Sequence, residues 1–376
     1  MPGSADGSVS TVGILGGGQL ARMLALAGIP WGLRFVFVSP RPDECAFALG
    51  RGVVADWASI EADPGLAGEA DVVTWEFENI SLRAVQRLQD CVRVFPSTES
   101  LAVKQDRLRE KEVFSRLGIP TARFLPVERL EDAVRAAGDL GLPLVVKTRS
   151  EGYDGKGQTI VRERAELEAL LSGGGHLMAE EFVPFDREIS IVAVRTSGGA
   201  CRFYPVVENI HRDGILRVSR CRPADPRWGE ACEYVRRLAE HFAYTGVLAV
   251  EFFEKDGRLL ANEFAPRVHN TGHWTIEGAE TSQFENHLRA VAGWEPGSTE
   301  PVAFAAMVNC IGKLPAPQDV ARIPGAHLHI YGKAISPQRK VGHVTVRADS
   351  PAALEQSLRQ VGKLLGEPVE PAAGAW

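Results

Sequence analysis

Apolar runs alternate with helical stretches along the first hundred residues. The stretch RMLALAG, which follows the first apolar run, has the spacing of an amphipathic helix. Strands separated by helices indicate a parallel sheet, whose ligands lie at the carboxyl ends of the strands. The apolar runs predict strands at residues 11–15, 35–38, 71–74 and 91–95.

The carboxyl edge of this predicted sheet carries two candidate ligand contacts. The turn Gly16-Gly17-Gly18-Gln19 follows the first strand, and backbone amides before a helix favour an anion. Glu76 follows the third strand and either faces a ligand or caps a helix. A nicotinamide-binding fold places an acidic residue after its second strand, but here that strand ends in Ser39-Pro40.

The remainder of the chain has an α+β pattern divided by glycine and proline. Gly118-Ile119-Pro120 indicates a domain boundary, and the density of proline and glycine rises again from Pro296. We predict an N-terminal Rossmann-like domain (1–118), a lid domain (119–183), a central domain (184–295) and a small C-terminal module (296–376). Helices are predicted at 97–118, 127–140, 231–244, 282–292 and 351–365, and strands at 144–147, 159–161, 178–183, 189–194 and, around Asp213-Gly214, 210–211 and 215–218.

Two apolar runs at residues 247–253 and 259–264 surround Asp256-Gly257, which predicts a β-hairpin. A strict two-residue turn places Glu251 and Glu263 on opposite faces of this hairpin. An odd or bulged loop places them opposite each other on one face. In that case two carboxylates meet with no obvious Lys or Arg between them, which is unfavourable unless a cation is bound.

Oxygen ligands with Asn262 beside them suit Mg²⁺, which proteins commonly share with substrate phosphates. The alternative is that both carboxylates lie on a solvated strand face. Arg267, His269, Asn270 and His273 follow directly, and so many polar side chains after a hairpin favour a functional site.

A glycine-rich segment at residues 151–158 lies between two predicted strands and follows Lys147. Glycine lets backbone amides approach phosphate, so the segment is either the cover of a triphosphate or a surface turn. It lacks the GxxxxGK[ST] pattern of a Walker loop. Near the C-terminus, Lys333, Arg339 and Lys340 surround a predicted turn at Ser336-Pro337, as a phosphate site or a solvated loop.

Composition restricts the class of protein. With 376 residues, 45% of them hydrophobic and 24% charged, the chain is typical of a soluble protein of several domains. Its net charge of -6 gives no general attraction to nucleic acid or an anionic membrane, and we expect a cytoplasmic protein without either partner. The six cysteines lack a CxxC pair, which argues against a zinc site or a disulfide framework.

Together these segments resemble the ATP-grasp enzymes, and among them the N5-carboxyaminoimidazole ribonucleotide synthetases of purine biosynthesis. The resemblance covers nearly the whole chain in the family's order. Two departures are Ala21, where Gly is more usual, and Arg149-Ser150-Glu151, where glycines are frequent; we expect Glu151 to point to solvent. The motifs are GGGQLARM, KTRSEGYDGKGQ, EEFVPFDREIS, NEFAPRVHNTGHWT and YGKAISPQRKVGH.

The resemblance implies an α/β and α+β multidomain ATP-grasp fold with an N-terminal preATP-grasp domain, and a homodimer. It also implies that 5-aminoimidazole ribonucleotide, ATP and bicarbonate give the N5-carboxy product, ADP and phosphate. Mg²⁺ is assigned to Glu251 and Glu263. ATP is assigned to Lys104, Lys147, Gly152, Tyr153, Asp154, Gly155, Lys156, Gly157, Gln158, Glu180, Glu181, Phe182, Val183, Glu188, His211, Asn262 and Glu263.

The same resemblance assigns the ribonucleotide and the carboxyphosphate intermediate. Catalytic roles fall on Asp154, Arg267, His269 and Asn270, and either Asp154 or His269 takes the amine proton. Mg²⁺, Lys147 and Arg267 would neutralise the transferring phosphoryl group. The substrate contacts are Gln19, Glu76, Tyr153, Asp154, Arg267, His269, Asn270, Lys333 and Arg339, of which Lys333 and Arg339 bind the ribose phosphate.

Two other functions fit parts of the sequence. A nicotinamide oxidoreductase rests on the glycine turn alone, and the serine after the second strand counts against it. The formate-dependent transformylase of the same pathway is another ATP-grasp enzyme of similar layout, but it would use formate and glycinamide ribonucleotide. Phosphate release measured with each substrate pair separates these two ligases.

The glycine-rich segment at 152–158 provides a first test. Its composition predicts a loop that becomes ordered over bound triphosphate, so ATP with Mg²⁺ should slow proteolytic cleavage within it. Limited proteolysis followed by mass spectrometry measures this. Equal cleavage rates with and without the nucleotide would mean that the segment is only a surface turn.

Overall fold

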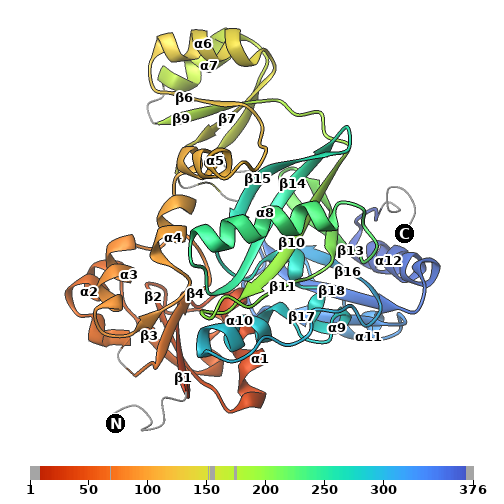
Figure 1. Ribbon diagram of the computed structural model, residues 1–376. Helices are drawn as coiled ribbons and strands as arrows, with labels where there is room; N and C mark the ends of the chain where they lie inside the picture. The colour runs from red at the N-terminus through yellow and green to blue at the C-terminus, as the bar shows by residue number, and fades with distance from the viewer. Residues whose placement is uncertain (1–8, 68, 151, 153–156, 173–175, 370–376) are drawn as a thin grey trace.

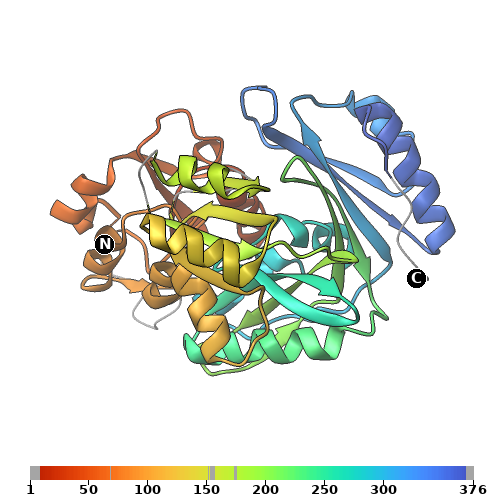
Figure 2. The ribbon, with the colours of Figure 1, turned by 90° about the horizontal axis from the view of Figure 1, so that it is seen from above.

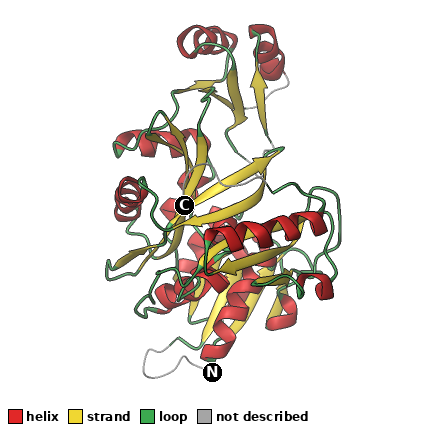
Figure 3. Ribbon diagram, turned by 90° about the vertical axis from the view of Figure 1, so that its right-hand side faces the viewer, coloured by secondary structure: helices red, strands yellow, loops and turns green. Residues whose placement is uncertain are grey.

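The computed structural model describes residues 9–67, 69–150, 152, 157–172 and 176–369 (Figure 1). Within these ranges the strands form three sheets, and no described helix is long and apolar enough to cross a membrane. The small upper sheet stands above the large central one in two perpendicular views (Figures 1 and 3). Seen from above, it lies between the N-terminal and C-terminal parts of the chain (Figure 2).

The N-terminal sheet is parallel, as predicted, with the strand order β3-β2-β1-β4-β5. Its apolar strand residues pack against α1 on one face and against α2 and α3 on the other. The edge strand β3 is mostly exposed and was not predicted. The elements are β1 (Thr11–Leu15), α1 (Gln19–Gly28), η1 (Ile29–Trp31), β2 (Arg34–Ser39), η2 (Phe47–Leu49), β3 (Arg51–Val54), α2 (Trp57–Ala62), η3 (Pro64–Ala67), β4 (Val72–Trp75), α3 (Leu82–Gln89) and β5 (Arg93–Val94).

The upper sheet is antiparallel, in the order β6-β9-β7-β8, and α6 and α7 cover one face of it (Figure 1). The predicted helix at 127–140 is wrong at its start, because residues 124–127 pair with β9 instead. The helix begins later, where the Asp132 carboxylate accepts the N–H groups of Glu128 and Arg129. The elements are β6 (Phe124–Val127), α6 (Leu130–Leu140), β7 (Leu144–Thr148), β8 (Gln158–Val161), α7 (Arg164–Ser172) and β9 (Leu177–Glu181).

The central sheet follows the order β15-β14-β10-β12-β13-β16-β18-β17, with β11 paired to β10. The strands after residue 296 therefore continue this sheet. Helix α8 packs on one face of it and α10 on the other. Its strands are β10 (Arg187–Arg195), β11 (Cys201–Phe203), β12 (Val206–Arg212), β13 (Ile215–Arg222), β14 (Gly246–Lys255), β15 (Arg258–Ala265), β16 (Phe304–Ile311), β17 (Ala326–Ile330) and β18 (Lys340–Ala348). The helices are α8 (Trp228–His241), η4 (Asn270–Gly272), α9 (Thr275–Gly278), α10 (Gln283–Ala292), α11 (Pro317–Val320) and α12 (Pro351–Leu365).

The long helix predicted at 97–118 is wrong, because the chain forms α4 (Thr98–Lys104) and α5 (Arg107–Arg116). Asp106 separates them. Its side chain accepts the N–H groups of Leu108 at 2.9 Å and Arg109 at 3.4 Å, which caps α5. The same carboxylate binds Arg149 at the end of β7, with 2.5 Å between Oδ2 and Nη2. The break thus ties the upper sheet to the helices below it.

Asp106 generates a stability prediction. Burial disfavours its carboxylate, but Arg149 and the capped amides outweigh burial and hold the pKa of Asp106 below its usual range. A lowered pKa stabilises the fold above the unfolded-state value of about 4, and this contribution is lost as the pH falls through the folded-state pKa. Asp106→Ala should lower the free energy of unfolding at pH 7 by about 1 to 2 kcal/mol.

Thermal and urea unfolding at pH 7 and at about pH 3 measure the effect. The difference between the parent and Asp106→Ala should shrink at the lower pH. Asp106→Asn serves as the matched control, since an amide can still cap the helix while the charge is lost. If Asp106→Asn loses as much stability as Asp106→Ala, the ion pair with Arg149 accounts for the effect. If neither variant loses stability, the prediction is contradicted.

Candidate active site

The hairpin of β14 and β15 closes with a two-residue turn. Lys255 lies opposite Arg258, and the two residues between them, Asp256 and Gly257, have φ of 49° and 70°. Positive φ at both positions matches the twist of a tight hairpin. The predicted hairpin and its Asp-Gly turn are therefore confirmed, and by the turn alone the two glutamates would face opposite sides.

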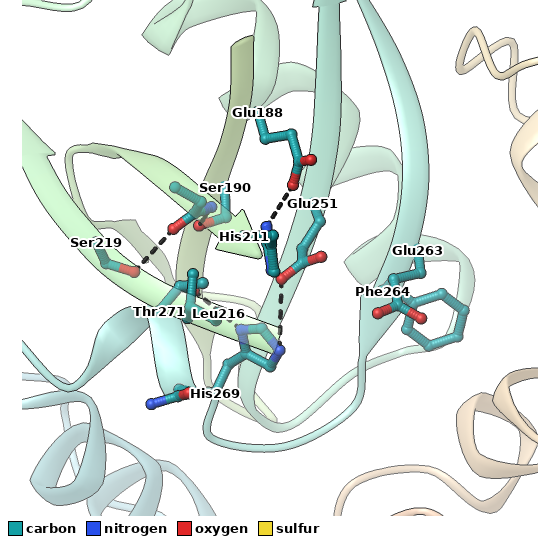
Figure 4. A network of polar contacts seen from close by, with 12 residues as sticks. Glu188, Ser190, His211, Leu216, Ser219, Glu251, Glu263, Phe264, His269 and Thr271 are labelled. Atoms are coloured by element: carbon teal, nitrogen blue, oxygen red, sulfur yellow. Dashed lines mark hydrogen bonds and ion pairs between the residues drawn. The ribbon is translucent and has the colours of Figure 1, made fainter. Parts of the chain in front are cut away.

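A β-bulge changes that outcome. Phe252 lies opposite Ala261, whereas the next pair along the hairpin is Glu251 opposite Glu263. Asn262 is the extra residue, and one extra residue reverses which face every following side chain occupies. The two carboxylates consequently lie on one face, as Figure 4 shows.

The charges around the pair are unequal. Lys104 from α4 places its Nζ 2.8 Å from Glu263 Oε2 and 3.2 Å from Glu110 Oε1. Burial opposes the Glu263 carboxylate, but this ammonium outweighs it and holds the pKa of Glu263 well below its usual range. Burial raises the pKa of Glu251 to about 7, with His211 opposing the shift and Glu263 adding to it. Negative charge at Glu251 is thus incompletely compensated.

A hard divalent cation fits these donors. Both carboxylates supply oxygen ligands, and the buried Oδ1 of Asn262 has no hydrogen-bond partner in the described part of the chain. A cation would compensate the Glu251 charge and satisfy such an oxygen. Lys104 was assigned to ATP, and the structure places it against Glu263, at the edge of the same cavity.

Two more strands extend the polar face. Glu188 on β10 and His211 on β12 meet at 2.5 Å between Oε2 and Nδ1 (Figure 4). Burial lowers the pKa of His211, but Glu188 and Glu251 more than offset this and raise it above its usual value. The structure therefore brings together four side chains that the sequence assigned to nucleotide or metal: Glu188, His211, Glu251 and Glu263.

The loop after β15 closes the cavity. Arg267 forms two hydrogen bonds to Glu78, Nε to Oε2 at 2.6 Å and Nη2 to Oε1 at 3.0 Å. Burial and Arg267 hold the pKa of His269 well below its usual range, and its Nε2 lies 3.7 Å from Glu251 Oε1. The cavity is lined by Glu78, Lys104, Ala249, Glu251, Glu263, Phe264, Ala265, Arg267 and His269.

Glu180 in β9 lies at the centre of the residues that the sequence analysis assigns to the nucleotide. It binds Lys147 at 3.0 Å and Lys111 at 3.5 Å, and both lysines are buried. Glu181 instead accepts the backbone N–H and the Nε of Arg123, at 2.9 and 2.7 Å. Phe182 and Val183 follow β9, and the Phe182 ring is exposed.

The glycine-rich segment is described only in part. Gly157 has φ of 71° and accepts the Thr148 N–H at 2.8 Å, and Gln158 begins β8 opposite Lys147. Gly152 is half-buried. The remaining assignments in this segment lie outside the described residues: Glu151, Tyr153, Asp154, Gly155 and Lys156.

The predicted phosphate contacts of the substrate come from opposite ends of the chain. Lys333 hydrogen-bonds to Gln19 Oε1 at the start of α1. Glu76 accepts the N–H groups of Gly18 and Ala21, at 2.9 Å for the latter, so it caps this helix. Burial lowers the pKa of Lys333, and the nearby Glu76 carboxylate partly opposes this shift. Arg339 is half-buried and donates to the Ala334 carbonyl at 3.3 Å.

Sequence reasoning missed several buried partners of the site. It chose Glu76 but not Glu78, although both follow β4. Gln283 contacts the backbone of His269, and Asn309 contacts the side chain of Asn270. Neither stands in a motif, and only the fold brings them to the site.

Three family models match consecutive parts of the chain. They are the ribonucleotide synthetase preATP-grasp domain over residues 9–105, the ATP-grasp domain over residues 112–284, and the phosphoribosylaminoimidazole carboxylase C-terminal domain over residues 305–357. The predicted fold class, an ATP-grasp fold with an N-terminal preATP-grasp domain, is confirmed.

Individual proteins match over nearly the whole length. A relative from Pseudomonas aeruginosa, named N5-carboxyaminoimidazole ribonucleotide synthase, is 49% identical over 94% of this chain and 99% of its own. The crystal structure of N5-carboxyaminoimidazole ribonucleotide synthetase from Thermus thermophilus is 50% identical, covers 96% of this chain and 100% of its own, and gives a TM-score of 0.91. The Aspergillus clavatus synthase, solved with ADP and 5-aminoimidazole ribonucleotide, is 28% identical over 96% and 99%, with a TM-score of 0.87.

Glu263→Gln tests the cation site directly. The amide keeps the size of the side chain but removes a negative ligand, so affinity for Mn²⁺ used as a probe should fall at least about tenfold. Titration calorimetry or electron paramagnetic resonance measures the affinity. The circular dichroism spectrum should match that of the parent, although loss of the ion pair with Lys104 lowers the melting temperature. Glu254→Gln is the matched control, because Glu254 lies on β14 but pairs with Arg187 and Arg227. Unchanged Mn²⁺ affinity in Glu263→Gln would contradict the assignment.

Proposed function

Because this chain belongs to the N5-carboxyaminoimidazole ribonucleotide synthase family of ATP-grasp ligases, we infer that it carboxylates 5-aminoimidazole ribonucleotide with ATP and bicarbonate. ADP, phosphate and the N5-carboxy product result, in purine biosynthesis. The observation that carries this inference is that the structure has two separate polar sites. One is the carboxylate pair Glu251 and Glu263 on the central sheet, and the other is the Lys333 ammonium, which hydrogen-bonds to Gln19. One suits the triphosphate and its cation, and the other suits the phosphate of the ribonucleotide.

The chemistry proceeds in two transfers. The γ-phosphoryl group moves from ATP to an oxygen of bicarbonate, which gives carboxyphosphate and ADP. The amine nitrogen of the ribonucleotide then attacks the carboxyl carbon, a C–N bond forms, and phosphate leaves. Each transfer places negative charge on phosphate oxygens. Cations held in fixed positions therefore lower the activation barrier more than covalent catalysis by the protein would.

Residues of this chain would supply that charge in fixed positions. Glu180 binds Lys147, and both carboxylate oxygens of Glu78 orient the guanidinium group of Arg267. We assign Mg²⁺ to Glu251 and Glu263, where it would neutralise phosphate oxygens during transfer. Either Asp154 or His269 takes the amine proton, and both assignments stay predictions.

The two alternative functions lose their support. Family membership over nearly the whole chain separates this protein from the formate-dependent transformylase and from nicotinamide oxidoreductases. An ADP-release assay with a panel of ribonucleotide amines, with and without bicarbonate, tests the assignment. Turnover should require both 5-aminoimidazole ribonucleotide and bicarbonate, and turnover with formate and glycinamide ribonucleotide instead would overturn it.

The homodimer and the cytoplasmic location expected from the sequence also stay proposals. Sedimentation velocity at micromolar concentration measures the oligomeric state. A single species with the mass of one chain across the concentration range would exclude the dimer.

Arg339→Ala tests the assignment of the second cationic site. Arg339 can form two hydrogen bonds to phosphate oxygens, so its removal should raise the KM for the ribonucleotide roughly tenfold to a hundredfold, about 1.5 to 3 kcal/mol. The KM for ATP should barely change. The dephosphorylated nucleoside should be a poor substrate for the parent and scarcely worse for the variant, since it lacks the phosphate.

The matched control is Arg322→Ala. Arg322 is an exposed arginine of the same C-terminal region, whose ion pair is with Asp319, and its loss should change neither KM. If Arg339→Ala instead weakened ATP binding and left the ribonucleotide KM unchanged, Arg339 would serve the nucleotide and not the substrate.

A further inference from the structure

One buried amide binds both backbone polar groups of His269. Gln283 Oε1 accepts the His269 N–H at 2.9 Å, and Gln283 Nε2 donates to the His269 carbonyl at 2.6 Å. A neighbouring β-strand would make the same two bonds, and His269 has the matching extended backbone, with φ of -127° and ψ of 150°. The side chain therefore continues strand-like pairing past the end of β15.

The surroundings leave this amide little freedom. Gln283 is fully buried at the start of α10, and its own N–H donates to Thr275 Oγ1 at 3.0 Å. The backbone at Gly272 packs directly against the Gln283 side chain, since a Cβ added at Gly272 would lie 2.5 Å from Gln283 Oε1. Gln283 Nε2 also lies 3.2 Å from His273 Nδ1. The geometry requires a group that both donates and accepts, which an amide does and a carboxylate does not.

A second amide holds the next residue. Asn270 Nδ2 donates to Asn309 Oδ1 at 3.1 Å, and Asn309 Nδ2 donates to Asn270 Oδ1 at 2.7 Å. Asn309 lies on β16, is 1% exposed, and also donates to the Leu216 carbonyl on β13 at 2.9 Å. The orientation of the Asn270 side chain is thus fixed by a strand from the last quarter of the chain.

We propose that Gln283 and Asn309 are positioning residues, which hold His269 and Asn270 in the geometry that carboxylation needs. The proposal rests on the function inferred above. Two amides from different elements fix two consecutive residues, one through its backbone and the other through its side chain. Gln283 fixes the backbone that carries the His269 imidazole, whose Nδ1 contacts Thr271 Oγ1 at 2.9 Å and whose Nε2 lies 3.7 Å from Glu251. Asn309 sets the orientation of the Asn270 amide.

A displacement of about 1 Å at such a site costs on the order of a hundredfold in rate, without loss of the fold. Gln283→Met keeps a similar volume and introduces no charge, but it leaves the His269 backbone unpaired. We expect kcat for ADP release to fall about tenfold to a hundredfold, with KM for ATP and ribonucleotide within about twofold of the parent. ADP binding at the parent's stoichiometry, measured by calorimetry, would show that the protein is fully folded.

A double-mutant cycle separates positioning from plain stabilisation. If Gln283 acts through the His269 imidazole, Gln283→Met should change kcat less than about twofold in a His269→Ala background. Its effect on melting temperature should be similar in both backgrounds, because the backbone bonds exist with either residue at 269. An equal fall of kcat in both backgrounds would overturn the proposal for Gln283.

Asn286→Asp is the matched control, since Asn286 is also a fully buried amide of α10. It donates to Tyr204 Oη at 2.7 Å and accepts the Gly297 N–H at 2.8 Å, away from residues 269 and 270. It should lower the melting temperature and leave kcat within about twofold of the parent. A fall of kcat as large as that of Gln283→Met would show that any buried polar change on α10 suffices, and would overturn the proposal.

Asn309→Leu allows an independent double-mutant cycle, in which its effect is measured in the parent and in the Asn270→Ala variant. It should lower kcat about tenfold or more in the parent and less than about twofold in Asn270→Ala. Equal losses in both backgrounds would remove Asn309 from the proposal. A parent protein that releases no ADP with 5-aminoimidazole ribonucleotide and bicarbonate would instead refute the proposed function, so the two failures are distinguishable.

Discussion

The site depends on a single extra residue in one hairpin. Without the bulge at Asn262, the two-residue turn at Asp256-Gly257 would direct Glu251 and Glu263 to opposite faces of the central sheet. With it, like charges share one face, and the protein must compensate them. Lys104 compensates Glu263 directly, while His211 compensates the negative charge of Glu251 only in part, and a divalent cation would compensate the rest. The proposed cation site thus depends on backbone register.

Ion pairs and hydrogen bonds between distant segments complete the site. Lys104 joins α4 to β15, and Arg267 joins the loop after β15 to Glu78 beyond β4. Lys333 joins the loop after β17 to Gln19 on α1. Buried charges of this kind contribute little net stability compared with apolar residues, but breaking one partner is costly. They therefore make the relative placement of the segments specific, which a site assembled from three sheets requires.

Local patterns predicted the elements but not their details. Alternating apolar runs gave the parallel sheet, and Asp-Gly gave the hairpin turn, because both signals act over a few residues. The bulge was left open, since nothing local distinguishes a bulged Asn262 from a paired one. The break at Asp106 was missed because its carboxylate is fixed by Arg149, some forty residues away in sequence. Gln283 and Asn309 were missed for the same reason: buried amides reveal their partners only after folding.

The shared central sheet also constrains how the chain reaches its native state during synthesis. Strand β13 pairs with β12 on one side and with β16 on the other, so one of its edges stays unpaired until the chain beyond residue 304 has been made. An unpaired strand edge is a template for association with other chains. A fragment that ends just before β16 would keep the whole segment that matches the ATP-grasp domain, residues 112–284, and still expose this edge. Pairing of β16 with β13 covers this edge, so the last strands are part of the central sheet and cannot be removed as an independent appendage.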